Sequence, residues 1–213
     1  RDAPFSGNLS LIQWARAQSP PCDWDAKLCS QAAYAGHVHV LKWARSRSPP
    51  CDWNEWVCRN AAQQGHLDVL WWARSQNPPC VWSVQVCIDA ASKGQHDILR
   101  WIRSQNPPCP WNADVCLEAA KNGHLSVLKW LRIHNDPPCD WDVKACLAAA
   151  TEANINQDMV QWLKKEANPA MAKSALLARD FTPRAPALKD NHDTLNAVYQ
   201  NKIDQMLNGL LDD

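Results

Sequence analysis

The sequence repeats one unit at a nearly constant period, and this repetition limits what the chain can fold into. The motif Pro-Pro-Cys-x-Trp places its cysteine at Cys22, Cys51, Cys80, Cys109 and Cys139, so the successive spacings are 29, 29, 29 and 30. All ten cysteines occupy two positions of this unit, and eleven of the thirteen tryptophans occupy two others. One such unit buries too little apolar surface to be stable, so the units must stack to form a core.

The first half of each unit is predicted to be a helix, which we call helix A. The turn before it contains the turn tryptophans, which are Trp24, Trp53, Trp82, Trp111 and Trp141. The next residue in each unit can cap a helix start through its side-chain oxygen, and these residues are Asp25, Asn54, Ser83, Asn112 and Asp142. In residues 22–50, helix A carries Cys29, Ala32 and Ala33, a narrow face of small residues that allows close packing. Gly36 and its equivalents end helix A, because glycine adopts the left-handed conformation at little steric cost.

The second half of each unit is predicted to be another helix, helix B, which the Pro-Pro pair stops. Its tryptophans are Trp14, Trp43, Trp72, Trp101, Trp130 and Trp162, and we expect them to stack as a ladder along the array. Its arginines are Arg16, Arg45, Arg74, Arg103 and Arg132. We expect this arginine row to neutralise helix C-termini and stack on tryptophan, and not to bind phosphate.

These patterns predict an all-α fold, an α-solenoid of stacked helix–turn–helix units. The motif A-A-x-x-G-H-[LV]-x-V-L, clearest in residues 32–37 and 61–66, resembles the ankyrin repeat. More narrowly, the chain resembles the Cys/Trp-rich ankyrin-like proteins of algae, other protists and giant viruses. The Thr-Pro-Leu-His start of the ankyrin helix A is absent, and the period is shorter than the usual ankyrin period of about 33. The resemblance therefore implies a reduced β-hairpin finger.

The period divides the chain into a repeat array, residues 1–168, and a C-terminal extension, residues 169–213. The array comprises a partial first repeat, 1–21, and repeats 22–50, 51–79, 80–108, 109–138 and 139–168. Aligning Gly7 with Gly36 places the start of the chain just before a helix B. We expect either that an upstream segment is missing or that another protein covers this edge, where Leu9, Leu11, Ile12 and Trp14 would be exposed.

The last repeat and the extension depart from the period. Ala153 takes the place of the turn glycine, and two residues are inserted before Met159, which is typical of a capping repeat. The extension is predicted to contain extended and helical segments. An amphipathic helix at about 193–211 carries Leu195, Met206 and Leu210 at helical spacing. We expect this helix to dock on the array or on a partner.

Charge and hydropathy exclude two broad classes of function. The chain has 22 Lys+Arg and 22 Asp+Glu, so it lacks the positive field of a nucleic-acid-binding protein. It also has no apolar run near the roughly 20 residues that a membrane-spanning helix needs. We expect a protein without a transmembrane segment, although peripheral association with a membrane complex stays open.

The cysteines and histidines could in principle ligate a metal. Cys-x6-Cys followed eight residues later by histidine recurs in several repeats, as in Cys22, Cys29 and His37. Zinc ligands usually lie two to four residues apart, and Gln95 replaces the histidine in residues 80–108. We interpret the helix-A cysteines as small core residues and the histidines as hydrogen-bonding the turn backbone. Inter-repeat disulfides are a lesser alternative, and reduced thiols favour an intracellular compartment such as the cytosol, the nucleus, or an organelle stroma or matrix.

The repetition also argues against catalysis. An active site needs a unique convergence of acid, base or nucleophile, whereas the polar residues here recur in four or five copies. In the extension, Asp180, His192 and Asp193 are expected to be surface charges or a helix cap. We therefore expect no enzyme activity, no cofactor, no metal and no small-molecule substrate.

Two tryptophans break the repeat. Trp56 and Trp71 stand where the other repeats mostly carry charged or amide side chains, so both are expected to be exposed. Exposed tryptophan is a preferred anchor of protein interfaces. In ankyrin-like families partners dock on the concave face of turn tips and helix A, and here that face is predicted to contain Asp23, Lys27, Trp56, Arg59, Gln85 and Asp114.

The predicted function is a non-catalytic scaffold for protein–protein interaction, an accessory or structural subunit of a larger assembly. Its partner-binding residues would also include Trp71 and, in the extension, Leu195, Met206 and Leu210. One alternative is a peripheral structural subunit of a plastid or mitochondrial membrane complex. An alternative of another class is a metal-binding or redox module formed by the repeated cysteines and histidines.

Overall fold

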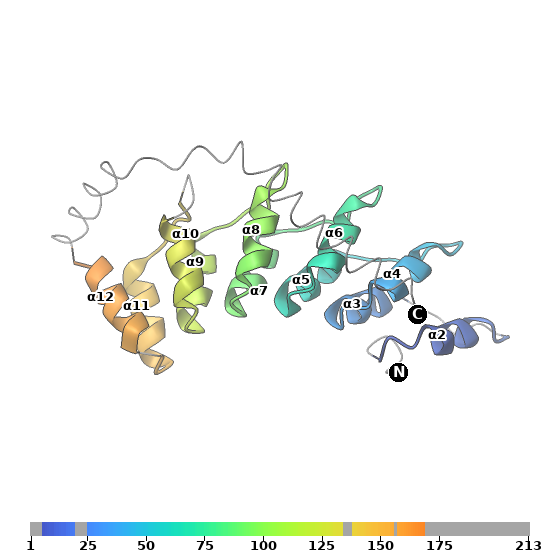
Figure 1. Ribbon diagram of the computed structural model, residues 1–213, viewed down its shortest axis with the longest axis horizontal. Coiled ribbons are helices and arrows are strands. Elements are labelled where there is room, and N and C mark those ends of the chain that lie inside the picture. The colour runs from blue at the N-terminus through green and yellow to red at the C-terminus, as the bar shows by residue number, and fades with distance from the viewer. Residues whose placement is uncertain (1–5, 20–24, 134–137, 156, 169–213) are drawn as a thin grey trace.

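The computed structural model describes residues 6–19, 25–133, 138–155 and 157–168, and in these ranges every regular element is a helix. The helices are α2 (Leu9–Arg16), α3 (Ala26–Tyr34), α4 (Val38–Arg45), α5 (Glu55–Gln64), α6 (Leu67–Ser75), α7 (Val84–Ser92), α8 (His96–Ser104), α9 (Ala113–Lys121), α10 (Leu125–Ile133), α11 (Val143–Glu152) and α12 (Gln157–Glu166). They follow one another along an elongated molecule (Figure 1). The prediction of an all-α fold is confirmed.

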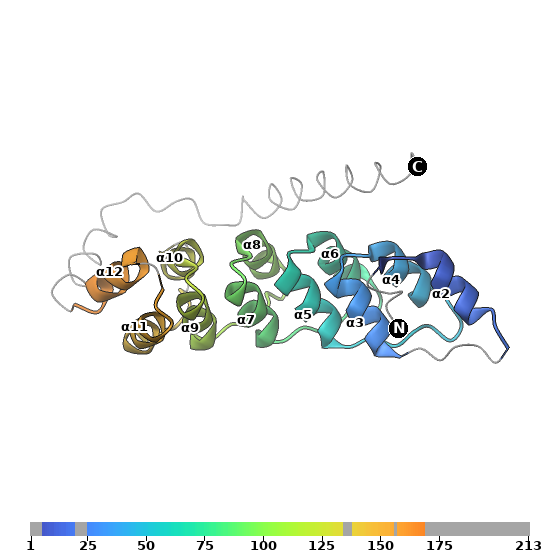
Figure 2. The same ribbon diagram turned by 90° about the horizontal axis from the view of Figure 1, so that it is seen from below.

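The helices form two layers, which Figure 2 shows most clearly. The helices A, which are α3, α5, α7, α9 and α11, pack side by side in one layer. The helices B lie in the other layer, and α4, α6, α8, α10 and α12 each pack on the helix A that precedes them in the chain. Neighbouring units contact each other mainly through their helices A, because that face carries cysteine and alanine and allows close approach.

Each helix A begins at the predicted capping residue. The Asp25 carboxylate accepts a hydrogen bond from the Lys27 backbone N–H at 2.8 Å, and Asn54 accepts one from the Trp56 N–H at 3.1 Å. Ser83, Asn112 and Asp142 accept equivalent bonds two residues on. The caps satisfy backbone donors that have no partner inside the helix, so these boundaries follow from local sequence.

The turn between helix A and helix B requires a left-handed residue. The turn glycines Gly7, Gly36, Gly65, Gly94 and Gly123 have φ between 67° and 84°. In the last unit the prediction that Ala153 takes the glycine's place is wrong, because Ala153 has φ −75° and Asn154 has φ 50°. Helix α11 runs one residue further than α9, and asparagine is among the few residues that tolerate this conformation.

The core lies between the two layers and continues along the array. In residues 51–79, Cys58, Ala61 and Ala62 from helix A meet Leu70 and Ala73 from helix B, and all five are fully buried. Equivalent residues are buried in the neighbouring units. The sequence pattern therefore predicted the core face of both helices correctly.

The apolar side chains of helix α2 are less exposed than predicted. Ile12 is only 4% exposed and packs on the core, and Leu9 is half-buried, whereas Leu11 and Trp14 are 45% and 62% exposed. Contact with the next unit explains the burial of Ile12, since one face of α2 continues the helix-B layer.

Within the described ranges, no helix combines the length and apolar character needed to cross a bilayer. Asp23 and the predicted amphipathic helix with Leu195, Met206 and Leu210 lie outside the described residues.

Candidate functional site

The arginine row joins each unit to the next. Arg45, Arg74, Arg103 and Arg132 each place the guanidinium carbon 3.9 to 4.8 Å from the ring centroid of the next unit's turn tryptophan. Each also donates from Nη1 to the carbonyl of the cysteine that follows the Pro-Pro pair. These four guanidinium groups are therefore used inside the array, and the expected stacking on tryptophan is confirmed.

The turn tryptophans complete this junction by packing on helix B of their own unit. The ring pairs are Trp53 with Trp72, Trp82 with Trp101, Trp111 with Trp130 and Trp141 with Trp162, at centroid distances of 5.7 to 6.3 Å. Trp72 and Trp101 contact turn tryptophans and not each other, so the predicted ladder of helix-B rings is wrong at these units. We call each group of arginine, turn tryptophan and helix-B tryptophan an Arg–Trp–Trp junction.

The repeated histidines also act between units. His66 Nε2 lies 3.1 Å from the Tyr34 carbonyl oxygen, and His124 Nε2 lies 3.0 Å from that of Ser92. Gln95, which replaces the histidine, donates to the Gln63 carbonyl at 3.2 Å. The bond thus reaches the turn of the preceding unit, and an amide can make it as well as an imidazole. The described part of the chain contains no cluster of three or more histidine, cysteine or carboxylate side chains that could hold a metal ion.

An outer row on the helices A carries the side chains that differ most between units. Lys27, Trp56, Gln85 and Asp114 occupy equivalent positions on α3, α5, α7 and α9. Trp56 is 48% exposed, and Lys27 and Asp114 are exposed as well. Gln85 is half-buried, because its amide donates to Asp89 Oδ1 at 3.2 Å. We call these four positions the helix-A row.

Trp56 is held in place by a chain of polar contacts. The Arg59 guanidinium carbon lies 4.0 Å from the centre of the Trp56 ring. Arg59 Nε donates to Asp89 Oδ2 at 2.7 Å, and its Nη1 lies 3.9 Å from Glu55 Oε1. Two carboxylates thus fix the guanidinium, and the guanidinium in turn supports one face of the indole.

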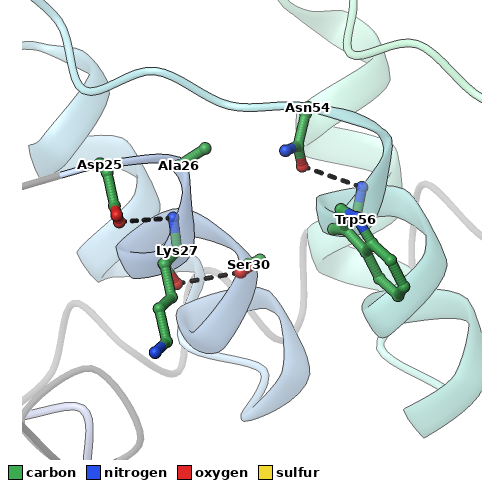
Figure 3. Close-up of a pocket in the computed structure, with 6 residues that line it drawn as sticks. All are labelled: Asp25, Ala26, Lys27, Ser30, Asn54 and Trp56. Atoms are coloured by element: carbon green, nitrogen blue, oxygen red, sulfur yellow. Dashed lines mark hydrogen bonds between the residues drawn. The ribbon is translucent and has the colours of Figure 1, made fainter.

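A shallow open depression of about 410 Å³ lies beside Trp56, between α3 and α5. Figure 3 shows Lys27 and Trp56 at its opposite sides. Its lining residues are Asp25, Ala26, Lys27, Ser30, Asn54 and Trp56. The carboxylate of Asp25 and the amide oxygen of Asn54 are used as helix caps, so an exposed ammonium group and an indole remain for contact with another molecule.

The expectation that Trp71 is exposed is wrong. Its side chain is half-buried and packs against the core, whereas at the equivalent positions Lys42, Arg100 and Gln161 are exposed and Lys129 is half-buried. Among the predicted partner-binding residues within the described ranges, the structure brings Lys27 and Trp56 to one depression and sets Arg59 beside Trp56.

Sequence reasoning missed Asp89, which positions Arg59 from the next unit. The signal was available, because one period after Arg59 the sequence reaches the residue just before Asp89, which places Asp89 beside Arg59 in the adjacent helix A. It also missed Tyr34 and Val81, which are exposed apolar side chains where other units carry mainly polar ones or proline.

Comparison with protein-family models and with curated protein sequences finds no match to this chain.

Proposed function

We propose that the chain is an ankyrin-like α-solenoid that works as a non-catalytic scaffold for binding other proteins, as an accessory or structural subunit of a larger assembly. The regular sequence period, the Gly-His turn and the two layers of helices support this proposal. Stacked helical units form extended surfaces on which side chains can vary without changing the fold. The helix-A row is such a surface here.

The observation that carries the proposal is the exposure and support of Trp56. A tryptophan that leaves about half of its surface in water gains apolar burial only when another molecule covers it. Its ring is already fixed by Arg59, so little conformational entropy is lost when a partner binds. Tryptophan and arginine are also the residue types most enriched among binding hot spots.

The charges around Trp56 favour a partner with an apolar side chain next to a carboxylate. Arg59 is balanced by Asp89 and Glu55, whereas the exposed Lys27 ammonium lies across the depression. A partner could place an apolar side chain on the Trp56 indole and a carboxylate near the Lys27 ammonium, so that it contacted both exposed groups. Lys27 is a weaker contributor, because an exposed ion pair contributes about 0.2 to 1 kcal/mol.

The test is capture of the native partner with Trp56→Ala. The intact chain is used as bait in an extract of its source, the captured proteins are identified, and the affinity of a purified partner is measured. We expect Trp56→Ala to weaken binding at least tenfold with an unchanged circular dichroism spectrum and unfolding midpoint.

Two controls accompany this experiment. Gln85→Ala changes the same row at a half-buried position, and we expect a smaller effect on affinity. Trp71→Ala removes a ring that packs on the core, so we expect it to lower stability and leave affinity nearly unchanged. Undiminished capture by a Trp56→Ala/Lys27→Ala double variant would exclude this surface as the binding site.

A further inference from the structure

Four pairs of cysteines lie across the boundaries between units. Each pair combines the helix-A cysteine of one unit with the turn cysteine of the next: Cys29 with Cys51, Cys58 with Cys80, Cys87 with Cys109, and Cys116 with Cys139. All eight are free thiols, and none is more than 1% exposed. We call them the boundary pairs.

The same geometry recurs at every boundary. The turn cysteine donates from Sγ to the carbonyl oxygen of the preceding unit's capping residue, at 3.3 Å for Cys51 and Cys80, 3.4 Å for Cys109 and 3.1 Å for Cys139. That capping residue stands four positions before the helix-A cysteine, so in an α-helix its carbonyl faces the N–H of that cysteine. Cys58 Sγ in turn lies 4.0 Å from the Cys80 carbonyl oxygen. The two cysteines of a pair therefore lie side by side across the boundary, and the turn cysteine is the group that most strongly shifts the pKa of the helix-A cysteine.

The two thiols of a pair are unequal. The neighbouring helix-A cysteine lowers the pKa of Cys51, Cys80 and Cys139, and the nearby arginine of the Arg–Trp–Trp junction acts in the same direction, although burial opposes both. The neighbouring turn cysteine, together with burial, raises the pKa of Cys29, Cys58, Cys87 and Cys116. Cys51, Cys80 and Cys139 therefore lose their protons more readily than their helix-A partners, and the thiolate is the form that attacks in thiol–disulfide exchange.

We propose that each boundary pair is an oxidation site that forms a disulfide between neighbouring units by exchange with a small-molecule disulfide such as oxidised glutathione. The turn cysteine loses its proton, and its thiolate attacks one sulfur of the oxidant, which forms a mixed disulfide and releases one thiolate. The helix-A cysteine then loses its proton and attacks the turn cysteine's sulfur, which releases the second thiolate. Two protein thiols are oxidised, one disulfide of the oxidant is reduced to two thiols, and no other reactant is needed.

Because the boundary thiols are buried, the oxidant can react with them only when neighbouring units separate. Units at the ends of a stacked array separate most readily. We therefore expect Cys29–Cys51 and Cys116–Cys139 to form before the two inner pairs. Once formed, each bond ties a unit to its neighbour and restricts the unfolded chain, so the oxidised protein should resist denaturation better.

Cys146 provides an internal control. It is the helix-A cysteine of the last unit, and no cysteine follows it in the sequence. Its thiol is buried, and burial raises its pKa to about 11. Cys146 shares the environment of the other helix-A cysteines but has no turn cysteine of a following unit beside it, so it should stay reduced.

The experiment incubates the fully reduced chain with oxidised glutathione, blocks remaining thiols by alkylation at successive times, and maps disulfides by mass spectrometry of proteolytic peptides. We expect the four boundary pairs as the dominant crosslinks, an alkylated Cys146 throughout, and a higher urea midpoint after oxidation. In Cys80→Ser the serine hydroxyl can still donate to the Asn54 carbonyl, so the fold is kept. We expect this variant to lose one crosslink and to leave Cys58 free.

The incubation is repeated at a urea concentration just below the unfolding transition. Units open and close there, so the oxidant can reach the buried thiols. The proposal is overturned if boundary crosslinks are absent under both conditions. It is also overturned if crosslinks such as Cys29–Cys58 exceed the boundary pairs, or if Cys146 oxidises as fast as Cys116.

Discussion

Arg103 joins two units through a single side chain. Its Nη1 donates to the Cys109 carbonyl at 2.5 Å, and its guanidinium carbon lies 3.9 Å from the centre of the Trp111 ring. Lysine keeps the charge but cannot offer a flat group to the ring and a directed N–H to the carbonyl together. We expect Arg103→Lys to lower the free energy of unfolding by about 1 to 2 kcal/mol, measured by urea denaturation.

Arg100 is the matched control for this prediction. It lies on the same helix, α8, and its side chain is exposed. Arg100→Lys should change the free energy of unfolding by no more than about 0.5 kcal/mol, as is usual for exposed substitutions. Equal losses in the two variants would show that the junction contributes nothing beyond its charge.

Gly94 is constrained twice, by its own backbone and by the next unit. Its φ is 69°, and a Cβ atom there would lie 2.6 Å from His124 Nδ1. In Gly123 the φ is 80°, but the nearest atom, Ile155 Cγ2, would be 3.1 Å away. We expect Gly123→Ala to cost about 1 to 2 kcal/mol, mainly from backbone strain because Ile155 has to shift only slightly, and Gly94→Ala to cost more because the imidazole must move further. Thermal unfolding of the two variants checks the order, and a smaller loss in Gly94→Ala would contradict it.

Sequence was most informative for residues whose role depends on their immediate neighbours. The capping of helix A by Asp25 or Asn54, and the left-handed glycines, follow from a few consecutive residues and were predicted correctly. Asn154 was missed because the left-handed residue of the last unit stands one position further from the helix-A cysteine than the glycines of the preceding units do. In the same unit, Ile155 takes the place of the histidine over Gly123.

At the scale of helices, Arg59 and Asp89 connect α5 to α7. Their side chains are 18% and 13% exposed, and two hydrogen bonds of 2.7 and 3.5 Å join them. A pair with this burial and geometry should contribute more than an open surface pair. We expect a double-mutant cycle with Arg59→Met and Asp89→Asn to give a coupling energy of about 1 kcal/mol, decreasing with added salt.

The control cycle uses Lys121 and Glu118, which lie 3.4 Å apart on α9 with the lysine exposed. That pair lies within one helix, so its coupling energy should be only about 0.3 kcal/mol. Comparable couplings in the two cycles would mean that the contact between α5 and α7 adds no stability of its own.

The number of helices and their buried faces could be predicted from the sequence, whereas most contacts between units could not. Two helices per unit and their buried faces follow from periodicity, since each helix has to bury its apolar side. The burial of Trp71 and the carbonyl partner of His66 could not be predicted, because both depend on how one unit is placed against the next. The exposure of Trp56 was predicted correctly, but its support by Asp89 required the spacing between helices A.

At the scale of the whole molecule, the array consists of nearly interchangeable junctions, so one complete unit should be removable. Deletion of residues 80–108 joins Pro79 to Cys109 in the original register. Arg74 then meets Trp111 in place of Trp82, and His124 takes the place of Gln95 over Gly65. The array loses one unit, while the contacts at the new boundary are of the same kind as those at the old one.

We expect this deletion variant to remain helical and to unfold cooperatively, with a smaller urea m-value because less surface is exposed on unfolding. Arg59 should recover an acidic partner, because Glu118 occupies the position that Asp89 held. Deletion of residues 80–94 removes helix A of the same unit and keeps its helix B, so α8 loses the surface on which it packs. Circular dichroism and urea denaturation of the two variants distinguish the outcomes. If both deletions unfold the chain, the units are not independent, and stability depends on contacts that extend beyond nearest neighbours.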